Sequence, residues 1–170
     1  MVAYAFRMPA GIPGDVNRIA SATIETQVVS SAAGEAPLTY GVPVVLSSTS
    51  GQVGNVRVMT SGDTALQPYG FIVRPFPTQS SQDPLNVSTP PTSGLVDILK
   101  RGYMTVQLQG PTAAAKGGQV FVFLGTTSTT HAVLGAVEAA TSTNAALLSS
   151  NSYFMGPADS NGMVEIAFNL

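Results

Sequence analysis

The sequence predicts an all-β protein, either a jelly-roll-like sandwich or a small barrel, with an extended N-terminal arm. Apolar residues recur in short runs that alternate with polar ones, which is the period-2 pattern of strands. The 17 glycines and 12 prolines help to separate these runs with turn signals. A length of 170 residues suffices for one hydrophobic core, so we expect a single domain over residues 1–170.

The clearest alternation lies in residues 103–109 and 163–170. The residues expected to point inward there are Met104, Val106, Leu108, Val164, Ile166, Phe168 and Leu170. Residues 120–124 are apolar on both faces, which predicts a strand that is buried on both sides. The other expected strands are residues 23–29, 42–47, 53–60, 69–74 and 95–100.

Residues 1–22 form the expected arm, because prolines and glycines between residues 9 and 14 favour an extended chain with a bend. Tyr4 and Phe6 make this segment too apolar for a solvated tail. The arm is therefore expected to pack on its own domain or to clasp a partner, and the pattern leaves both open.

Two further stretches do not fit the strand pattern. Residues 75–93 contain five prolines among Ser, Thr and Gln, which predicts a long interaction loop. Residues 132–150 are rich in alanine and tolerate a helix in part, but residues 141–143 interrupt it. Their structure depends on tertiary contacts.

The charge content narrows the possible partners. Only 9% of the residues are charged, so Ser, Thr, Gly, Asn and Gln must cover much of the exterior, as in a protein that stays bound to a larger assembly. The formal charge of −2 and the absence of a basic stripe argue against nucleic acid. No apolar run reaches the roughly 20 residues that span a bilayer, and no signal peptide is recognisable. We expect no membrane association, and we expect the chain to be made in the cytoplasm.

The motifs offer little catalytic chemistry. The chain has no cysteine and one histidine, His131, which we expect in a loop or at the start of a strand. The residues Asp159-Ser160-Asn161-Gly162 fit a turn better than a calcium loop. We therefore expect no enzyme activity, catalytic residue, cofactor or metal, although a hydrolase that uses Glu138 or Glu165 stays a minor alternative.

Several segments carry a family resemblance. Residues 3–18, 69–77, 156–159 and 164–169, with 90–94, 101–104 and 115–118 between them, resemble the structural cement proteins of tailed bacteriophages. The resemblance covers nearly the whole chain. It implies a capsid decoration protein on the outer face of an icosahedral shell, where it binds the major capsid protein and ties neighbouring capsomers together. The family fold that it implies is similar to a jelly roll or small sandwich, with no catalytic residues.

The partner contacts are inferred from residue chemistry. Interfaces favour Arg, Met and aromatic residues over Lys, and this chain has five arginines and two lysines. Charge-assisted bonds from arginine, strand addition by the arm and docking of the proline-rich loop are the expected modes. The contact candidates are Tyr4, Phe6, Arg7, Arg18, Arg57, Arg74 and Phe76. We also expect self-association, with a dimer favoured and a trimer possible.

A different class of function fits the same fold. A tail or baseplate module that binds a host surface glycan is also a β protein, and it would present aromatic platforms. The absence of tryptophan argues against this alternative.

Overall fold

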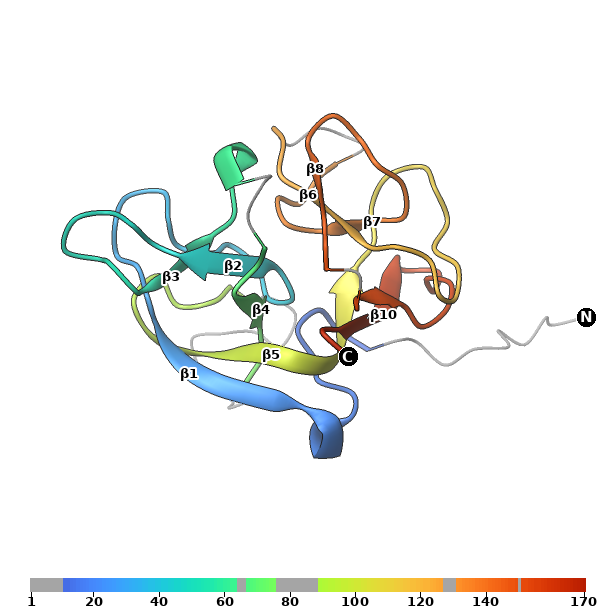
Figure 1. Cartoon of the computed structure of the whole chain (residues 1–170), viewed down its shortest axis with the longest axis horizontal. Coiled ribbons are helices and arrows are strands. Elements are labelled where there is room, and N and C mark those ends of the chain that lie inside the picture. The colour runs from blue at the N-terminus through green and yellow to red at the C-terminus, as the bar shows by residue number, and fades with distance from the viewer. Residues whose placement is uncertain (1–10, 64–66, 76–88, 127–130, 150) are drawn as a thin grey trace, which may run out of the picture.

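The computed structural model describes residues 11–63, 67–75, 89–126, 131–149 and 151–170 (Figure 1). The strands are β1 (Thr23–Val29), β2 (Pro43–Leu46), β3 (Val56–Val58), β4 (Gly70–Ile72), β5 (Gly94–Gln107), β6 (Phe121–Phe123), β7 (Val137–Glu138), β8 (Ala145–Leu147), β9 (Tyr153–Phe154) and β10 (Met163–Phe168). Two short 3₁₀ helices, η1 (Ile19–Ser21) and η2 (Ser61–Asp63), complete the regular elements of the described residues. The prediction of an all-β protein is confirmed.

Five strands close into a small barrel in the order β1-β3-β2-β4-β5, because β1 pairs with both β3 and β5 (Figure 1). The β1–β3 pair is parallel, with Val29 opposite Val56, and the other pairs are antiparallel. Of the two predicted architectures, a jelly-roll-like sandwich and a small barrel, the chain therefore forms the small barrel. Closure leaves none of these five strands as a long open edge in the barrel wall.

Strand β5 joins two segments that the sequence predicts as separate strands, residues 95–100 and 103–109. Its first half pairs with β1 and β4, and its second half pairs with β10. Between the halves the register shifts, since Thr23 lies opposite Arg101 whereas Ile24 lies opposite Leu99. Gly102 adopts a φ of +139° there. The strand bends at this irregularity instead of ending. The prediction of two separate strands, residues 95–100 and 103–109, was therefore wrong.

A second sheet, ordered β7-β6-β8, packs beside the barrel (Figure 1). Alternate residues of β2, of β4 and of the middle of β5 serve two cores. Val44, Ile72 and Ile98 belong to the inner cluster, and their neighbours Val45, Phe71 and Leu99 belong to the larger cluster shared with the second sheet. The predicted burial of residues 120–124 is confirmed for all but the half-buried Phe121.

The alanine-rich stretch forms strands and turns over its described residues 132–149. Strand β8 pairs with β6, so that Ala146 lies opposite Val122 in the core. The helix that the composition tolerated does not form there, because pairing with β6 satisfies the backbone and buries Ala146 and Leu148. The predicted inward residues of 163–170 are confirmed from Val164 to Phe168, and Leu170 is half-buried.

Candidate functional site

The N-terminal segment runs along β5 before it reaches η1. The Gly14 amide donates to the Thr105 carbonyl at 2.9 Å, and the Thr105 amide donates to the Asp15 carbonyl at 2.9 Å. The Asn17 side-chain amide also donates to the Thr105 hydroxyl at 3.1 Å. Thr105 is fully buried as a result, although its place on the polar side of the alternation predicted an outward side chain.

A hollow of about 540 Å³ lies beside this segment. The N-terminal segment contributes Ile12, Asp15, Val16, Asn17 and Ile19. The other lining residues are Ile24 of β1, Asp97 of β5, and Val73, Arg74 and Pro75 after β4. We call this hollow the arm groove.

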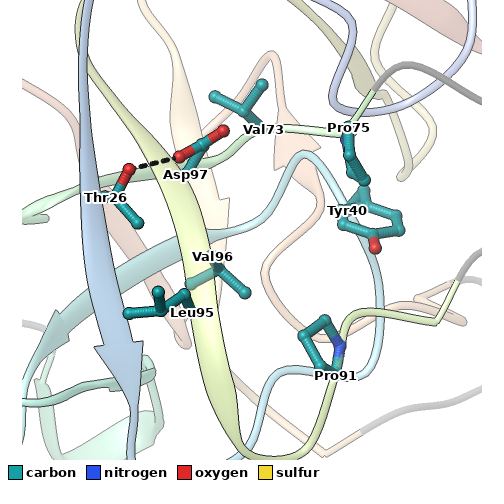
Figure 2. Close-up of a pocket in the computed structure, with 8 residues that line it drawn as sticks. All are labelled: Thr26, Tyr40, Val73, Pro75, Pro91, Leu95, Val96 and Asp97. Carbon is teal, nitrogen blue, oxygen red and sulfur yellow. Dashed lines mark hydrogen bonds between the residues drawn. The ribbon is translucent and has the colours of Figure 1, made fainter. Parts of the chain in front are cut away.

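A second hollow of about 280 Å³ adjoins the arm groove, because Val73, Pro75 and Asp97 line both. Figure 2 shows Tyr40, Pro75 and Pro91 across this hollow from β1 and β5. The Thr26 hydroxyl donates to Asp97 at 2.7 Å on the β1–β5 side (Figure 2). The two hollows give this side of the barrel a continuous concave surface.

Strand β1 turns apolar side chains outward next to these hollows. Ile24 and Val28 are 40% and 43% exposed, and Leu95, opposite Val28 on β5, is 67% exposed. The alternate residues Glu25 and Gln27 are half-buried and contact the Tyr69 hydroxyl. We call Ile24, Val28 and Leu95 the β1–β5 face. The hydrogen-bonded Thr26–Asp97 pair lies between Ile24 and the Val28–Leu95 pair. Exposed apolar side chains gathered on one side of a sheet mark interaction sites.

One of the predicted contact residues lines this surface, and a second follows a lining residue in the chain. Arg74 lines the arm groove, and its guanidinium lies 5.7 Å from the centre of the Tyr40 ring. Arg18 lies between the lining residues Asn17 and Ile19, and its side chain is 47% exposed. Its guanidinium stacks 4.0 Å from the Tyr103 ring centre and lies 3.4 Å from Glu165.

Arg57 has a different environment. Its guanidinium pairs with Asp63 through two bonds of 2.7 Å, and its side chain is only 16% exposed. Both terminal nitrogens are engaged within the chain, so we do not carry Arg57 forward as a partner contact. Tyr4, Phe6, Arg7 and Phe76 lie outside the described residues, as does most of the expected interaction loop.

Sequence reasoning missed the outward orientation of β1. The alternation of Ile24, Thr26 and Val28 with Glu25 and Gln27 was visible, but a period of two does not say which face meets the core. Cross-strand pairing decides this, because Val29 and Val96 enter the inner cluster while Val28 and Leu95 face solvent.

The residues considered for catalysis have structural partners. His131, outside any strand, lies 2.7 Å from the buried Glu138 and stacks on Phe123 at 4.4 Å between ring centres. The Ser142 hydroxyl donates to Glu138 and not to an imidazole. Asp159 accepts the amides of Asn161 and Met163 at 2.8 and 2.9 Å, as the turn interpretation predicts.

Two features are absent from the described part of the chain. No group of three or more His, Asp or Glu side chains is placed to hold a metal ion there. No helix in those residues is long and apolar enough to cross a membrane.

Comparison with known proteins defines the class. The family model described as the XM1 gp53 minor capsid protein matches residues 1–168. A match over this length makes the chain a structural protein of a phage capsid. It belongs to the XM1 gp53 minor capsid protein family. The predicted resemblance to capsid structural proteins of bacteriophages is confirmed at this level.

The fold has a counterpart among solved structures. A chain in "The capsid of Myoviridae Phage XM1" superposes with a TM-score of 0.67 at 16% sequence identity. The match covers 98% of this chain and 95% of that one, so the two share a fold over their whole length. A search of curated proteins gave no match.

Proposed function

We propose that this chain binds the outer face of an icosahedral phage capsid and cements neighbouring capsomers. The observation that carries the proposal is the β1–β5 face, an apolar surface turned to solvent on a protein that belongs to a minor capsid family. Burying Val28 and Leu95 against the major capsid protein removes apolar area from water and so favours binding. The protein is a structural component and performs no catalysis.

Charge supports the outer face over the inner one. Packaged DNA lines the inside of a filled shell, and binding there rewards basic surfaces that neutralise phosphate. This chain has a formal charge of −2, with nine acidic and seven basic residues. It gains nothing from DNA and is suited to a site outside the shell, after synthesis in the host cytoplasm.

Binding of this chain to the shell would stabilise the shell by thermodynamic linkage. A ligand that binds only the closed lattice stabilises that lattice, because its binding free energy must be lost before the lattice opens. Many copies act together on one shell, so modest contacts by each copy suffice. Arg18 and Arg74 remain our candidates for bonds to acidic capsid groups. Tyr4, Phe6 and Arg7 of the arm and Phe76 of the loop, from the undescribed segments, remain candidates for contact with the capsid or with another copy of the chain.

We include self-association in the proposal, with a dimer first and a trimer second. Closed symmetric forms are the commonest arrangement of identical chains. Exposed apolar residues on the chain, among them Leu38 and Val53, supply surface for such contacts.

Co-sedimentation with shells of the matching major capsid protein tests the proposal. The purified chain is added to DNA-free expanded and immature shells, and the bound copies are counted by quantitative mass spectrometry. We expect saturation at a fixed ratio that the icosahedral symmetry allows. Absence of binding to both the expanded and the immature shells would overturn the proposal and favour a tail or baseplate role.

A matched pair of variants locates the contact. Leu95→Asp places a charge on the β1–β5 face, and Leu147→Asp places one on an exposed residue of β8 in the other sheet. We expect the first to weaken shell binding by about ten-fold or more, since desolvating a carboxylate is costly, and the second to bind like the unmodified chain. Equal binding by both variants would contradict the assignment of this face.

A further inference from the structure

The lining of the arm groove is complementary to a ligand of particular chemistry. Its apolar lining includes Ile12, Ile19 and Ile24, which are 46%, 67% and 40% exposed. Asp15 and Asp97 contribute two carboxylates to the lining, against the one guanidinium of Arg74. An occupant with an apolar face and a positive charge complements this surface.

The first ten residues have this chemistry. Val2, Tyr4, Phe6 and Met8 alternate with Ala3, Ala5 and Arg7, so an extended chain places the four larger apolar side chains on one face. Arg7 is the one charged side chain in residues 1–10, which contain no acidic residue. Ten extended residues reach roughly 33 Å, enough to enter a neighbouring molecule.

The position of residue 12 favours a neighbour over the same chain. Ile12 itself lines the groove, and residues 14–17 that follow are bonded to β5 through Gly14, Asp15 and Asn17. A chain folding back into its own groove would have to reverse direction within a few residues of Ile12. The arm of a second copy needs no such reversal.

We infer that the arm groove of one copy receives residues 1–10 of a second copy, with the Val2, Tyr4, Phe6 and Met8 face against the isoleucines. Arg7 lies on the opposite face of the extended arm, and its positive charge is attracted to the two carboxylates of the groove from there. This inference rests on the proposed function for the close spacing of copies, because neighbours on a shell raise the effective concentration of each arm. Exchanged arms would tie one cement molecule to the next.

Engineered cysteines test this inference in the full chain, which contains no cysteine of its own. Copies carrying Val2→Cys or Met8→Cys are mixed with size-tagged copies carrying Ile24→Cys, in solution and on shells. After mild oxidation, non-reducing gels resolve the mixed disulfide dimer. The matched control replaces Ile24→Cys by Leu147→Cys, which is exposed on β8.

We expect at least about ten-fold more mixed dimer with Ile24→Cys than with Leu147→Cys, in solution or on shells, and a lower yield when Arg7→Glu is added. Equal yields for the two acceptors would overturn the inference. A Met8→Cys, Ile24→Cys double variant that forms only an internal disulfide would also overturn it, because the arm would then occupy its own groove.

The experiment distinguishes failure of the cement function from failure of arm exchange. Shell binding of the unmodified chain is measured by co-sedimentation in parallel. Normal saturation without cross-linking would reject arm exchange and retain cementing. Cross-linking in solution without shell binding would retain arm exchange and reject cementing.

Discussion

Arg57 and Asp63 form a bidentate ion pair, in which each terminal nitrogen of Arg57 lies 2.7 Å from one carboxylate oxygen of Asp63. The Thr60 amide and hydroxyl also donate to the carboxylate, at 2.8 and 3.0 Å. The pair fixes the end of β3 to η2. Hydrogen bonding by Arg57 lowers the pKa of Asp63 from 3.8 to about 2.

The stability of the protein should depend on this pair in acid. The carboxylate contributes about 2 kcal/mol at pH values above 4, because its pKa is lower in the folded chain than in the unfolded one. This contribution is lost as the pH falls from about 4 to 2. Asp63→Asn should lower the free energy of unfolding at pH 6 by about 3 kcal/mol, since it leaves the Arg57 guanidinium unpaired.

Urea unfolding at pH 6 and pH 2.5 checks this prediction. The difference between the unmodified chain and Asp63→Asn should shrink by about 2 kcal/mol in acid. Asp97→Asn, on the exposed β1–β5 side, should keep the full acid response of the pair. An unchanged difference at the two pH values would contradict the role assigned to Asp63.

Thr105→Val should loosen the N-terminal segment from β5. The variant keeps the shape of the side chain but removes the hydroxyl that accepts from Asn17. We expect a loss of about 1–2 kcal/mol and faster hydrogen exchange at the Gly14 and Asn17 amides. Thr26→Val, whose hydroxyl is exposed, should cost under about 0.5 kcal/mol. Unchanged exchange in Thr105→Val would show that the hydroxyl does not hold the segment.

Gly70→Ala should disrupt the barrel. A Cβ at residue 70 would lie 2.4 Å from Ile98 Cγ2 and 2.5 Å from the Leu99 carbonyl oxygen, so β4 could not keep its place beside β5. We expect a loss of at least about 3 kcal/mol or failure to fold. Gly62→Ala, with nothing closer than 3.8 Å, should change stability by under about 1 kcal/mol. Thermal melts of both variants decide the matter, and similar melting temperatures would contradict the close packing of β4 on β5.

Asp159→Ala should weaken the turn before β10. It removes the side-chain acceptor of the Asn161 and Met163 amides, which should cost about 1–2 kcal/mol. Calcium and EDTA should leave the melting temperature of the unmodified chain unchanged. A rise in melting temperature with calcium that Asp159→Ala abolishes would replace the turn by an ion site.

The strands were largely predictable because their local signals agree with the fold. The predicted strand 23–29 has the bounds of β1, and residues 163–168 have the predicted alternation. The break placed near Gly102 was wrong because a glycine that signals a turn also permits a bend within a strand. Residues 145–147 had no clear pattern, and only pairing with β6 makes them a strand.

The candidate site was less predictable, because it depends on which face of a strand meets the core. Arg57 and Arg74 look alike in sequence, yet one pairs with Asp63 and the other lines the arm groove. The apolar side chains of Ile24 and Leu95 are typical of core residues, although both are exposed in the structure. Such assignments require pairing partners that are distant in the sequence.

The temperature of DNA release tests cementing most directly. DNA-filled particles assembled without this chain are heated with a DNA-binding dye, alone, with saturating unmodified chain and with Leu95→Asp. We expect the unmodified chain to raise the release temperature by several degrees and Leu95→Asp to leave it near that of bare particles. Full occupancy of the shell by the unmodified chain with no rise in release temperature would contradict the cement function.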